Sequence, residues 1–193
     1  MSLTHSPTRS LGGMVAAAHP LAAAAGAEIL RKGGNAFDAV VATVATLNVV
    51  EPFMSGLAGL GVATCWIEKE KRIRCLDFTP NVPKEFLAEK LDKEATNTGP
   101  SASGVPGNLS GWCTLHSKYG SKKLSELMAP AIRHAQEGFP VSNLYVHMAN
   151  LTAARACTPE WRHVYMGGLD RIEENWILRQ PLLAHTSVSY THL

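Results

Sequence analysis

Few residues of this 193-residue chain stand at spacings that known chemistry requires. Ser55, with His19 and Asp38 upstream, supplies the residue types of a hydrolase triad. A serine nucleophile of that class usually sits in a Gly-x-Ser-x-Gly elbow, which Ser55 lacks. Cys113 and His116 stand three positions apart on an expected helix, as half of a metal site would, but no second pair accompanies them. We therefore interpret Ser55 as a turn residue and predict no metal site.

A glycine-rich turn at residues 55–61 suggests phosphate binding. Gly56, Gly59 and Gly61 have the spacing of a reversed dinucleotide fingerprint. That fingerprint cradles phosphate between a strand and a following helix, whereas this turn follows an expected helix and precedes an expected strand. The order favours a packing turn, and we predict no cofactor.

Asp77 and Thr79 form a polar pair that could face a substrate. Strands are expected at residues 61–68 and 72–78, joined by a short polar turn. Side chains alternate along a strand, so Cys75, Asp77 and Thr79 should share one face. A strand-end aspartate more often holds a turn than a ligand, and both interpretations stay open here.

Two helices are expected before these residues, and the second of them should be the central buried element. A helix is expected over residues 21–32, ended by Gly33. Asn35 should cap a second helix over residues 36–50, with the Asp38 carboxylate in its first turn. That helix is apolar on almost every side, which is typical of a buried helix. It is too short to span a bilayer, which needs about 20 apolar residues.

The other expected elements are less strongly patterned. They are a short buried strand at 14–18, an irregular surface excursion at 83–103, and helices at 107–118, 121–137 (capped by Ser121) and 142–155 (capped by Ser142), before a less regular part at 158–193. This order predicts an α/β (α+β) layered domain that needs more strands than the chain supplies.

The composition excludes several classes of protein. Hydrophobic residues make up 46% and charged residues 18%, values typical of a globular domain. The net charge of +2 gives no footprint for nucleic acid, and we expect no membrane span. No signal peptide is recognised in the short polar leader, residues 1–11, so we expect a cytoplasmic protein. The cysteines form no Cys-x-x-Cys pair, and we interpret them as reduced, mostly buried thiols: Cys65, Cys75, Cys113 and Cys157.

Short motifs follow one another in a specific order along residues 12–186. They are Gly13-Met14-Val15-Ala16, His19-Pro20-Leu21-Ala22, Gly33-Gly34-Asn35-Ala36, Val49-Val50-Glu51-Pro52, Ser55-Gly56, Leu76-Asp77-Phe78, Gly104-Val105-Pro106-Gly107, Ala129-Pro130-Ala131-Ile132, Gly138-Phe139-Pro140-Val141 and Gln180-Pro181. The set resembles the gamma-glutamyltransferase family, also called gamma-glutamyltranspeptidases or glutathione hydrolases. By this resemblance, residues 12–186 are the N-terminal part of the large subunit. Residues 187–193 depart from the family, and we interpret them as a non-native tail.

The resemblance implies the N-terminal nucleophile hydrolase fold, a four-layer αββα sandwich that is incomplete in this chain. Members of the family are made as one precursor that cuts itself into two subunits. The new N-terminal threonine of the small subunit attacks the gamma-glutamyl amide of glutathione and forms an acyl-enzyme. That threonine would lie beyond residue 193, so we expect no catalytic residue in this chain and no activity from it alone. The expected partners are a small subunit and a small acyl-amide substrate.

One position departs from the family in a way that bears on the substrate. After Asp-Phe the family usually has an arginine, which pairs with the α-carboxylate of the gamma-glutamyl group, and Thr79 stands there. A hydroxyl cannot replace the two-pronged contact of a guanidinium. Either Arg72 or Arg74 takes over this role, or the substrate lacks that carboxylate. Three hypotheses follow: a gamma-glutamyl hydrolase, an acylase or amidase of the same fold, and a catalytically dead binding or structural member.

Overall fold

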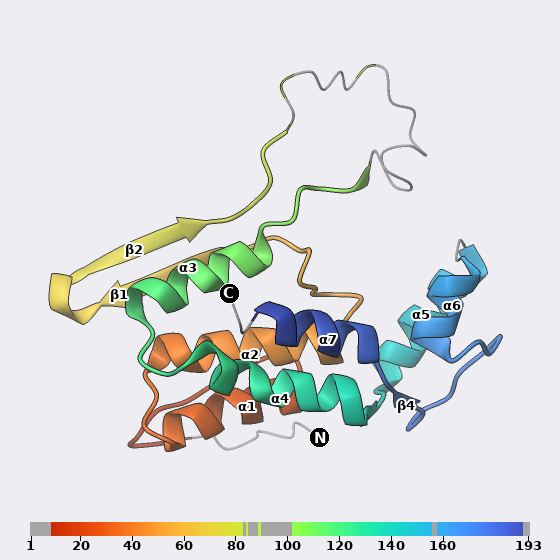
Figure 1. Cartoon of the computed structure of the whole chain (residues 1–193), viewed down its shortest axis with the longest axis horizontal. Coiled ribbons are helices and arrows are strands. Elements are labelled where there is room, and N and C mark those ends of the chain that lie inside the picture. Colours follow the sequence, from red (N-terminus) through yellow and green to blue (C-terminus); the bar gives the residue numbers. More distant parts are fainter. Residues whose placement is uncertain (1–8, 83, 85–88, 90–101, 156–157, 191–193) are drawn as a thin grey trace, which may run out of the picture. The chain divides into compact units, whose positions relative to one another are not determined.

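The computed structural model describes residues 9–82, 84, 89, 102–155 and 158–190. It divides into two compact units, one formed by Met1–Gly56 with His116–Leu193 and the other by Leu57–Leu115. Figure 1 traces their helices and strands. Most of the expected leader and most of the expected surface excursion at 83–103 lie outside the described residues.

The first helix, α1 (Pro20–Arg31), begins and ends as its sequence predicts. Pro20 occupies the first turn, and His19 Nδ1 accepts a hydrogen bond from Leu21 N at 3.2 Å. At the other end Gly33 has φ +78°, which suits glycine. Its N–H donates to Leu30 O at 3.0 Å, and the next N–H, of Gly34, donates back to Ile29 O at 2.9 Å. This pair of bonds is a Schellman motif, which satisfies the last carbonyls of the helix.

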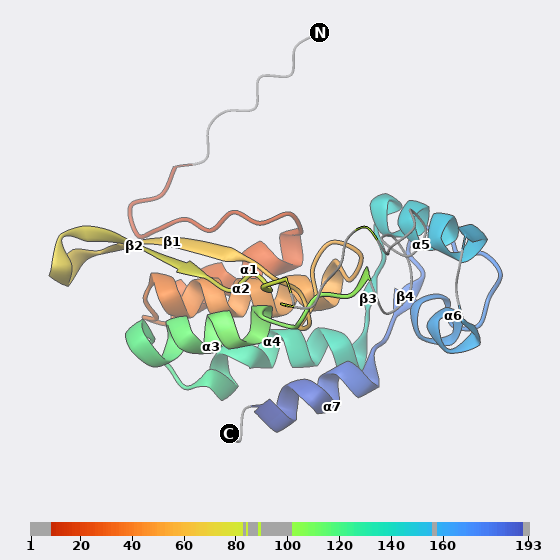
Figure 2. The same cartoon turned by 90° about the horizontal axis from the view of Figure 1, so that it is seen from above.

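Helix α2 (Ala36–Val50) is the buried element of the first unit, as predicted. Asn35 and Asp38 form a reciprocal capping box at its N-terminus. The helix packs against α1 and against α4 (Leu124–Glu137), as Figures 1 and 2 show. Gly26 allows the close approach of α1, because a Cβ there would lie 2.1 Å from Thr43 Oγ1.

The C-terminal part of the first unit is more regular than the sequence suggested. Helix α5 (Asn143–Arg155) is followed by α6 (Pro159–Met166) and α7 (Pro181–Tyr190). Strands β3 (Phe139–Pro140) and β4 (Ile177–Leu178) pair antiparallel. Helix α7 packs against α4 (Figure 2). Buried Gln180 Nε2, just before α7, donates to Val49 O at 2.8 Å and so joins this segment to α2.

Two expected helix caps have different outcomes. Ser142 caps α5 as predicted, since its Oγ accepts from Tyr145 N at 3.2 Å. The prediction for Ser121 is wrong: α4 begins at Leu124 with Lys123 as its N-cap residue. The Ser121 hydroxyl donates to Asp38 instead, at 2.5 Å. The Ser121 side chain therefore bonds to a residue far away in the sequence and does not cap the adjacent helix.

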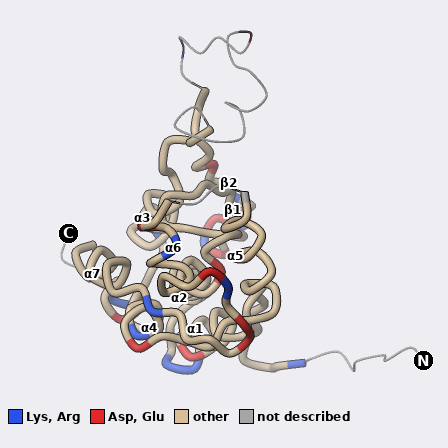
Figure 3. Tube along the Cα trace, turned by 90° about the vertical axis from the view of Figure 1, so that its right-hand side faces the viewer, with Lys and Arg blue, Asp and Glu red and all other residues tan. Residues whose placement is uncertain are grey.

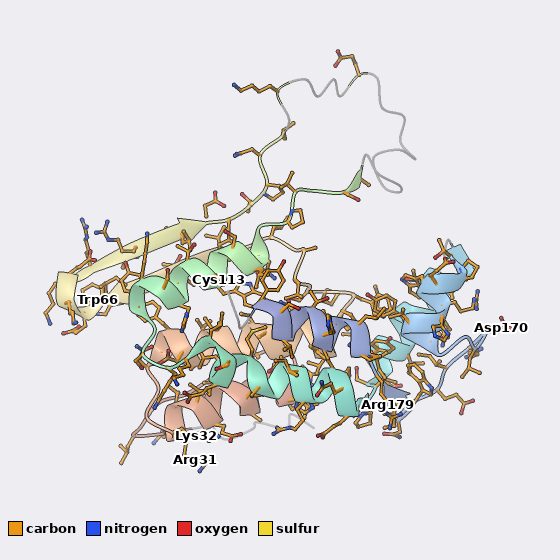
Figure 4. All side chains as sticks on the ribbon, viewed as in Figure 1. Arg31, Lys32, Trp66, Cys113, Asp170 and Arg179 are labelled. Carbon is orange, nitrogen blue, oxygen red and sulfur yellow. The ribbon has the colours of Figure 1, made fainter. Side chains whose placement is uncertain are left out.

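The second unit contains the predicted hairpin. Strand β1 (Val62–Ile67) pairs antiparallel with β2 (Arg72–Asp77), and Val62 lies opposite Asp77. The short 3-10 helix η1 (Glu68–Glu70) and a left-handed Lys71 make the turn. Trp66, labelled near the turn in Figure 4, is 54% exposed. Helix α3 (Asn108–Tyr119) starts in this unit, close to the predicted position.

Two other expectations need correction. Residues 14–18 form no strand, since they pair with no other strand among the described residues, and Met14 is exposed rather than buried. Of the cysteines that the structure describes, Cys75 is exposed, and Cys65 and Cys113 are half-buried. The prediction of mostly buried thiols is therefore wrong for these three. The exposure of Cys75 follows from its place on β2, which is solvent-accessible along most of its length.

The charges are mixed along the chain. Figure 3 shows acidic and basic positions interspersed along the trace. Glu28 of α1, for example, pairs with Lys32, the residue that follows this helix. Among the described residues, no helix combines the length and the apolar character needed to cross a membrane. The helices and the two short antiparallel sheets together make an α+β arrangement.

Candidate functional site

Phe78, the residue between Asp77 and Thr79, is held by three glycines. A Cβ on Gly107 would lie 2.1 Å from the Phe78 carbonyl oxygen. A Cβ on Gly111 would lie 2.4 Å from the Phe78 ring, and one on Gly61 would lie 2.6 Å from it. No larger residue fits at these positions without displacing Phe78. The end of β2 is therefore positioned by close backbone packing.

Backbone hydrogen bonds fix the segment that carries two of these glycines. Gly59 O accepts from Gly107 N at 3.0 Å and from Asn108 N at 2.9 Å. The Asn108 side chain accepts from buried Trp112 Nε1 at 2.8 Å. The glycine turn after α2 thus packs against the start of α3, which agrees with its interpretation as a packing turn.

Asp77 and Thr79 contact each other directly. Asp77 Oδ1 accepts from Thr79 N at 2.9 Å and from Thr79 Oγ1 at 2.7 Å. These bonds, first from the backbone N–H and then from the hydroxyl, hold the pKa of Asp77 below its usual range. The aspartate does hold a turn at the end of the strand, and it is ionised near neutral pH.

The same two residues line an open cleft of about 500 Å³ within the second unit. Its lining residues are Leu76, Asp77, Phe78, Thr79, Pro80, Asn81, Val105, Pro106, Gly107, Ser110, Gly111 and Thr114. This volume is in the range of small-molecule sites. Among these described residues there is one carboxylate and no lysine, arginine or histidine.

Neither arginine of β2 supplies a cation to Thr79. Arg72 Nε donates to Glu70 Oε2 at 2.8 Å, and Arg74 Nε donates to the same oxygen at 2.7 Å. Both guanidinium groups are thus held by Glu70 at the turn end of the hairpin, whereas Thr79 follows the opposite end of β2. The idea that one of them replaces the family arginine finds no support in this geometry.

The residues of the apparent triad have separate structural roles. Ser55 Oγ donates to Asn48 Oδ1, and His19 caps α1. Asp38 accepts hydrogen bonds from Asn35, Ser121 and Lys122. Burial raises the pKa of Asp38, but these hydrogen bonds outweigh burial and leave it below its ordinary value. Ser55 is therefore a turn residue, as predicted.

The described residues bring no further metal-ligating side chain to the pair Cys113 and His116. His116 Nε2 lies 2.8 Å from Lys122 O, so one ring nitrogen of the imidazole is engaged by the backbone. Burial raises the pKa of the Cys113 thiol, which disfavours the thiolate that would bind a metal. No group of three metal-ligating side chains occurs in the part of the chain that the structure describes.

Comparison with known proteins identifies the family. The sequence profile of the gamma-glutamyltranspeptidases matches residues 22–188. The chain belongs to the gamma-glutamyltranspeptidase family. A crystal structure of this family, the gamma-glutamyltranspeptidase of Helicobacter pylori, superposes with a TM-score of 0.88 and 30% identity, over 97% of this chain and 56% of that one. The α+β arrangement is accordingly part of the N-terminal nucleophile hydrolase fold.

Curated relatives in the family include two kinds of proenzyme. The glutathione hydrolase proenzyme of Bacillus subtilis is 33% identical over 182 residues, which cover 90% of this chain and 31% of that protein. The acylase ACY 1 proenzyme of Pseudomonas sp. strain SE83 is 36% identical over 149 residues, which cover 70% of this chain and 26% of that protein. The chain thus spans about a third or less of the length of these relatives.

Sequence reasoning missed the residues that position the site. Gly107 was predicted to begin a helix, but its contact with Phe78, and that of Gly111, depend on the fold. The sequence did carry one sign of this packing, a glycine in the first turn of an expected helix. Glycine weakens a helix, so its presence there indicates that another group packs closely against it. Asp77 and Thr79 were predicted together, and the structure brings them together at the cleft.

Proposed function

We propose that this chain is the N-terminal part of the large subunit of a proenzyme that cleaves gamma-glutamyl amides such as glutathione. The observation that carries the proposal is the match to the gamma-glutamyltranspeptidase profile along residues 22–188. The relatives named above as proenzymes support a maturation step, and with it a small subunit as partner.

The proposed reaction has two steps on a threonine outside this chain. The threonine hydroxyl oxygen bonds to the acyl carbon, its proton passes to the α-amino group of the same residue, and the carbon–nitrogen bond of the amide breaks as the amine leaves with a proton. Water or an amino acid then takes the acyl group from the threonine ester. This chain would contribute by holding the acyl group.

Asp77 and Thr79 are the residues that we propose to contact the acyl group. They line the cleft in the second unit, and their mutual hydrogen bonds fix their positions. By resemblance, Thr79 stands where the family places the arginine that binds the substrate α-carboxylate. The three-glycine packing around Phe78 would keep both side chains in place while substrate binds.

A second candidate is an acylase or amidase of the same fold with a different acyl group. The specific observation in its favour is the absence of lysine, arginine and histidine from the described lining of the cleft. An α-carboxylate would find no partner of opposite charge there. On this candidate, the complete protein turns over glutathione only weakly.

Hydrolysis of glutathione by the full-length protein, followed as glutamate release, tests the proposal. We expect release of glutamate and transfer of the gamma-glutamyl group to an added amino acid. A Thr79→Arg variant should raise kcat/KM on gamma-glutamyl p-nitroanilide about tenfold, since it adds a charge-assisted contact. Thr79→Gln, of similar length but uncharged, is the matched control and should give no such gain.

The outcomes separate the candidates. Glutamate release from glutathione that is as efficient as cleavage of any other acyl amide would reject the second candidate. Cleavage of other acyl amides with little glutathione turnover would reject the first. Failure to cleave any amide would leave the third hypothesis, a binding or structural member, and would refute both.

A further inference from the structure

The cleft in the second unit carries a fixed negative charge. Asp77 is the one charged residue among its described lining residues. The nearest basic residues in sequence, Arg72 and Arg74, are engaged by Glu70. Nothing described in the lining neutralises the Asp77 carboxylate, so this cleft attracts cations and repels anions.

Thr79 leaves one carboxylate oxygen of Asp77 available. Both of its hydrogen bonds go to Oδ1, at 2.9 Å from the backbone N–H and at 2.7 Å from the hydroxyl. Oδ2 accepts no hydrogen bond from the described residues. The carboxylate is therefore held in one orientation, with an acceptor ready for a further donor. An ammonium group suits it, because it supplies charge and hydrogen-bond donors together.

The rest of the lining suits a short carbon chain. Leu76, Phe78, Pro80, Val105 and Pro106 contribute apolar groups to the cleft, and its volume of about 500 Å³ holds a small acyl group. The other side chains of the lining, those of Thr79, Asn81, Ser110 and Thr114, are polar but uncharged. A lining with these groups and one carboxylate favours a short chain that carries one positive charge. A carboxylate on that chain would meet the like charge of Asp77.

We propose that the cleft accepts an acyl chain that bears an amino group and no carboxylate, so that the preferred substrates are amides of ω-amino acids. The inference rests on the second candidate function, an acylase or amidase of this fold, because it takes the Asp77–Thr79 cleft as the site of a different acyl group. It replaces recognition of an α-carboxylate by recognition of an ammonium group at Asp77.

Four p-nitroanilides that differ in two groups test the inference on the full-length protein. The gamma-glutamyl compound carries both an amine and a carboxylate, the 4-aminobutyryl compound the amine, the glutaryl compound the carboxylate, and the butyryl compound neither. We expect kcat/KM to be highest for 4-aminobutyryl, about fivefold above butyryl and at least tenfold above glutaryl, as for a charge contact partly screened by water.

Asp77→Asn isolates the charge. The asparagine keeps an Oδ1 that can accept both bonds from Thr79, so the turn is preserved while the charge is lost. In this variant the ratio of kcat/KM for the 4-aminobutyryl compound to kcat/KM for the butyryl compound should fall to about one. Asp170→Asn is the matched control: this carboxylate pairs with Arg162, is not among the lining residues, and is labelled in Figure 4. It should leave the ratio as in the parent protein.

The outcomes distinguish this inference from the function on which it rests. Cleavage of none of the four anilides would overturn both. Cleavage with glutaryl or gamma-glutamyl preferred would overturn the inference and leave amide hydrolysis standing. A preference for 4-aminobutyryl that survives in Asp77→Asn would also overturn it, because the ammonium group would then be bound elsewhere.

Discussion

Asp38 joins the start of α2 to the loop before α4, and its replacement should destabilise the first unit. The side chain is fully buried and accepts four hydrogen bonds. They come from Asn35 N at 2.9 Å, Ser121 N at 2.8 Å, Ser121 Oγ at 2.5 Å and Lys122 N at 3.1 Å. Ser121 is 83 positions away in sequence. The carboxylate therefore closes a long loop as well as capping a helix.

Asp38→Asn keeps the shape and removes one acceptor oxygen. If the amide oxygen retains the two bonds made by Oδ1, the amide NH₂ takes the place of Oδ2. The Ser121 hydroxyl can rotate to accept from it, but Asn35 N–H then faces another donor. Losing that bond costs about 1–1.5 kcal/mol, and leaving the N–H unsatisfied adds about 1–3 kcal/mol. We expect a loss of about 3 kcal/mol in the free energy of unfolding.

Urea unfolding of the full-length protein measures this loss. With a slope of about 3 kcal/mol/M, the midpoint should fall by about 1 M. Hydrogen exchange adds a local readout, since the backbone N–H groups of Ser121 and Lys122 should lose protection. Glu126→Gln, which changes an exposed carboxylate in the first turn of α4, is the control and should shift stability by less than about 0.5 kcal/mol.

The effect should also depend on pH. The folded-state pKa of Asp38 is below its ordinary value, so its contribution is complete above the unfolded pKa of about 3.9. The contribution is lost as pH falls through the folded pKa, because protonation is then favoured in the unfolded chain. The gap between the parent protein and Asp38→Asn should be constant from pH 7 to pH 5 and narrow below about pH 4. Equal midpoints at pH 7, or a gap that widens in acid, would refute the reasoning.

Two further substitutions test the packing of each unit. Gly107→Ala places a Cβ 2.1 Å from the Phe78 carbonyl oxygen, so it should lower the free energy of unfolding in urea by about 2 kcal/mol. It should also lower kcat/KM, because Thr79 follows Phe78. Gly56→Ala is the control and should be neutral, since a Cβ added there meets no atom within 4 Å, and equal effects of the two variants would contradict the close packing around Phe78. Gln180→Leu removes the side-chain donor to Val49 O and should lower the free energy of unfolding by about 1–3 kcal/mol. Gln136→Leu, at an exposed position, is the control and should cause no such loss. An unchanged stability in Gln180→Leu would show that this hydrogen bond contributes nothing.

Local chemistry made the first two helices predictable. The ends of α1 and α2 depend on residues a few positions apart, namely the glycines at 33–34, the Asn35 cap and Asp38. Asp77 and Thr79 are two positions apart, and their contact is equally local. In each case the hydrogen bonds join residues a few positions apart and follow from the residue types, so these parts could be predicted from the sequence.

Long-range contacts limited the rest. Ser121 had an adjacent helix to cap, but Asp38 offered a buried charged acceptor from far along the chain. Residues 14–18 have the pattern of a strand, yet a strand needs a neighbour, and the described residues provide none. The contacts of Gly107 and Gly111 with Phe78 likewise depend on how the segments meet. The N-terminal nucleophile hydrolase fold was predicted from the resemblance to the family, because the spacing of apolar residues alone did not indicate it.

Maturation of the full-length protein tests the central proposal most directly. Intact-mass measurement of the purified protein, with N-terminal sequencing of each polypeptide, shows whether the precursor is cut and where. We expect two polypeptides, the larger containing residues 22–188 and the smaller beginning with threonine, and a single chain when that threonine is replaced by alanine. A folded protein that stays as one uncut chain, or a smaller polypeptide that begins with a residue other than threonine, would contradict the account.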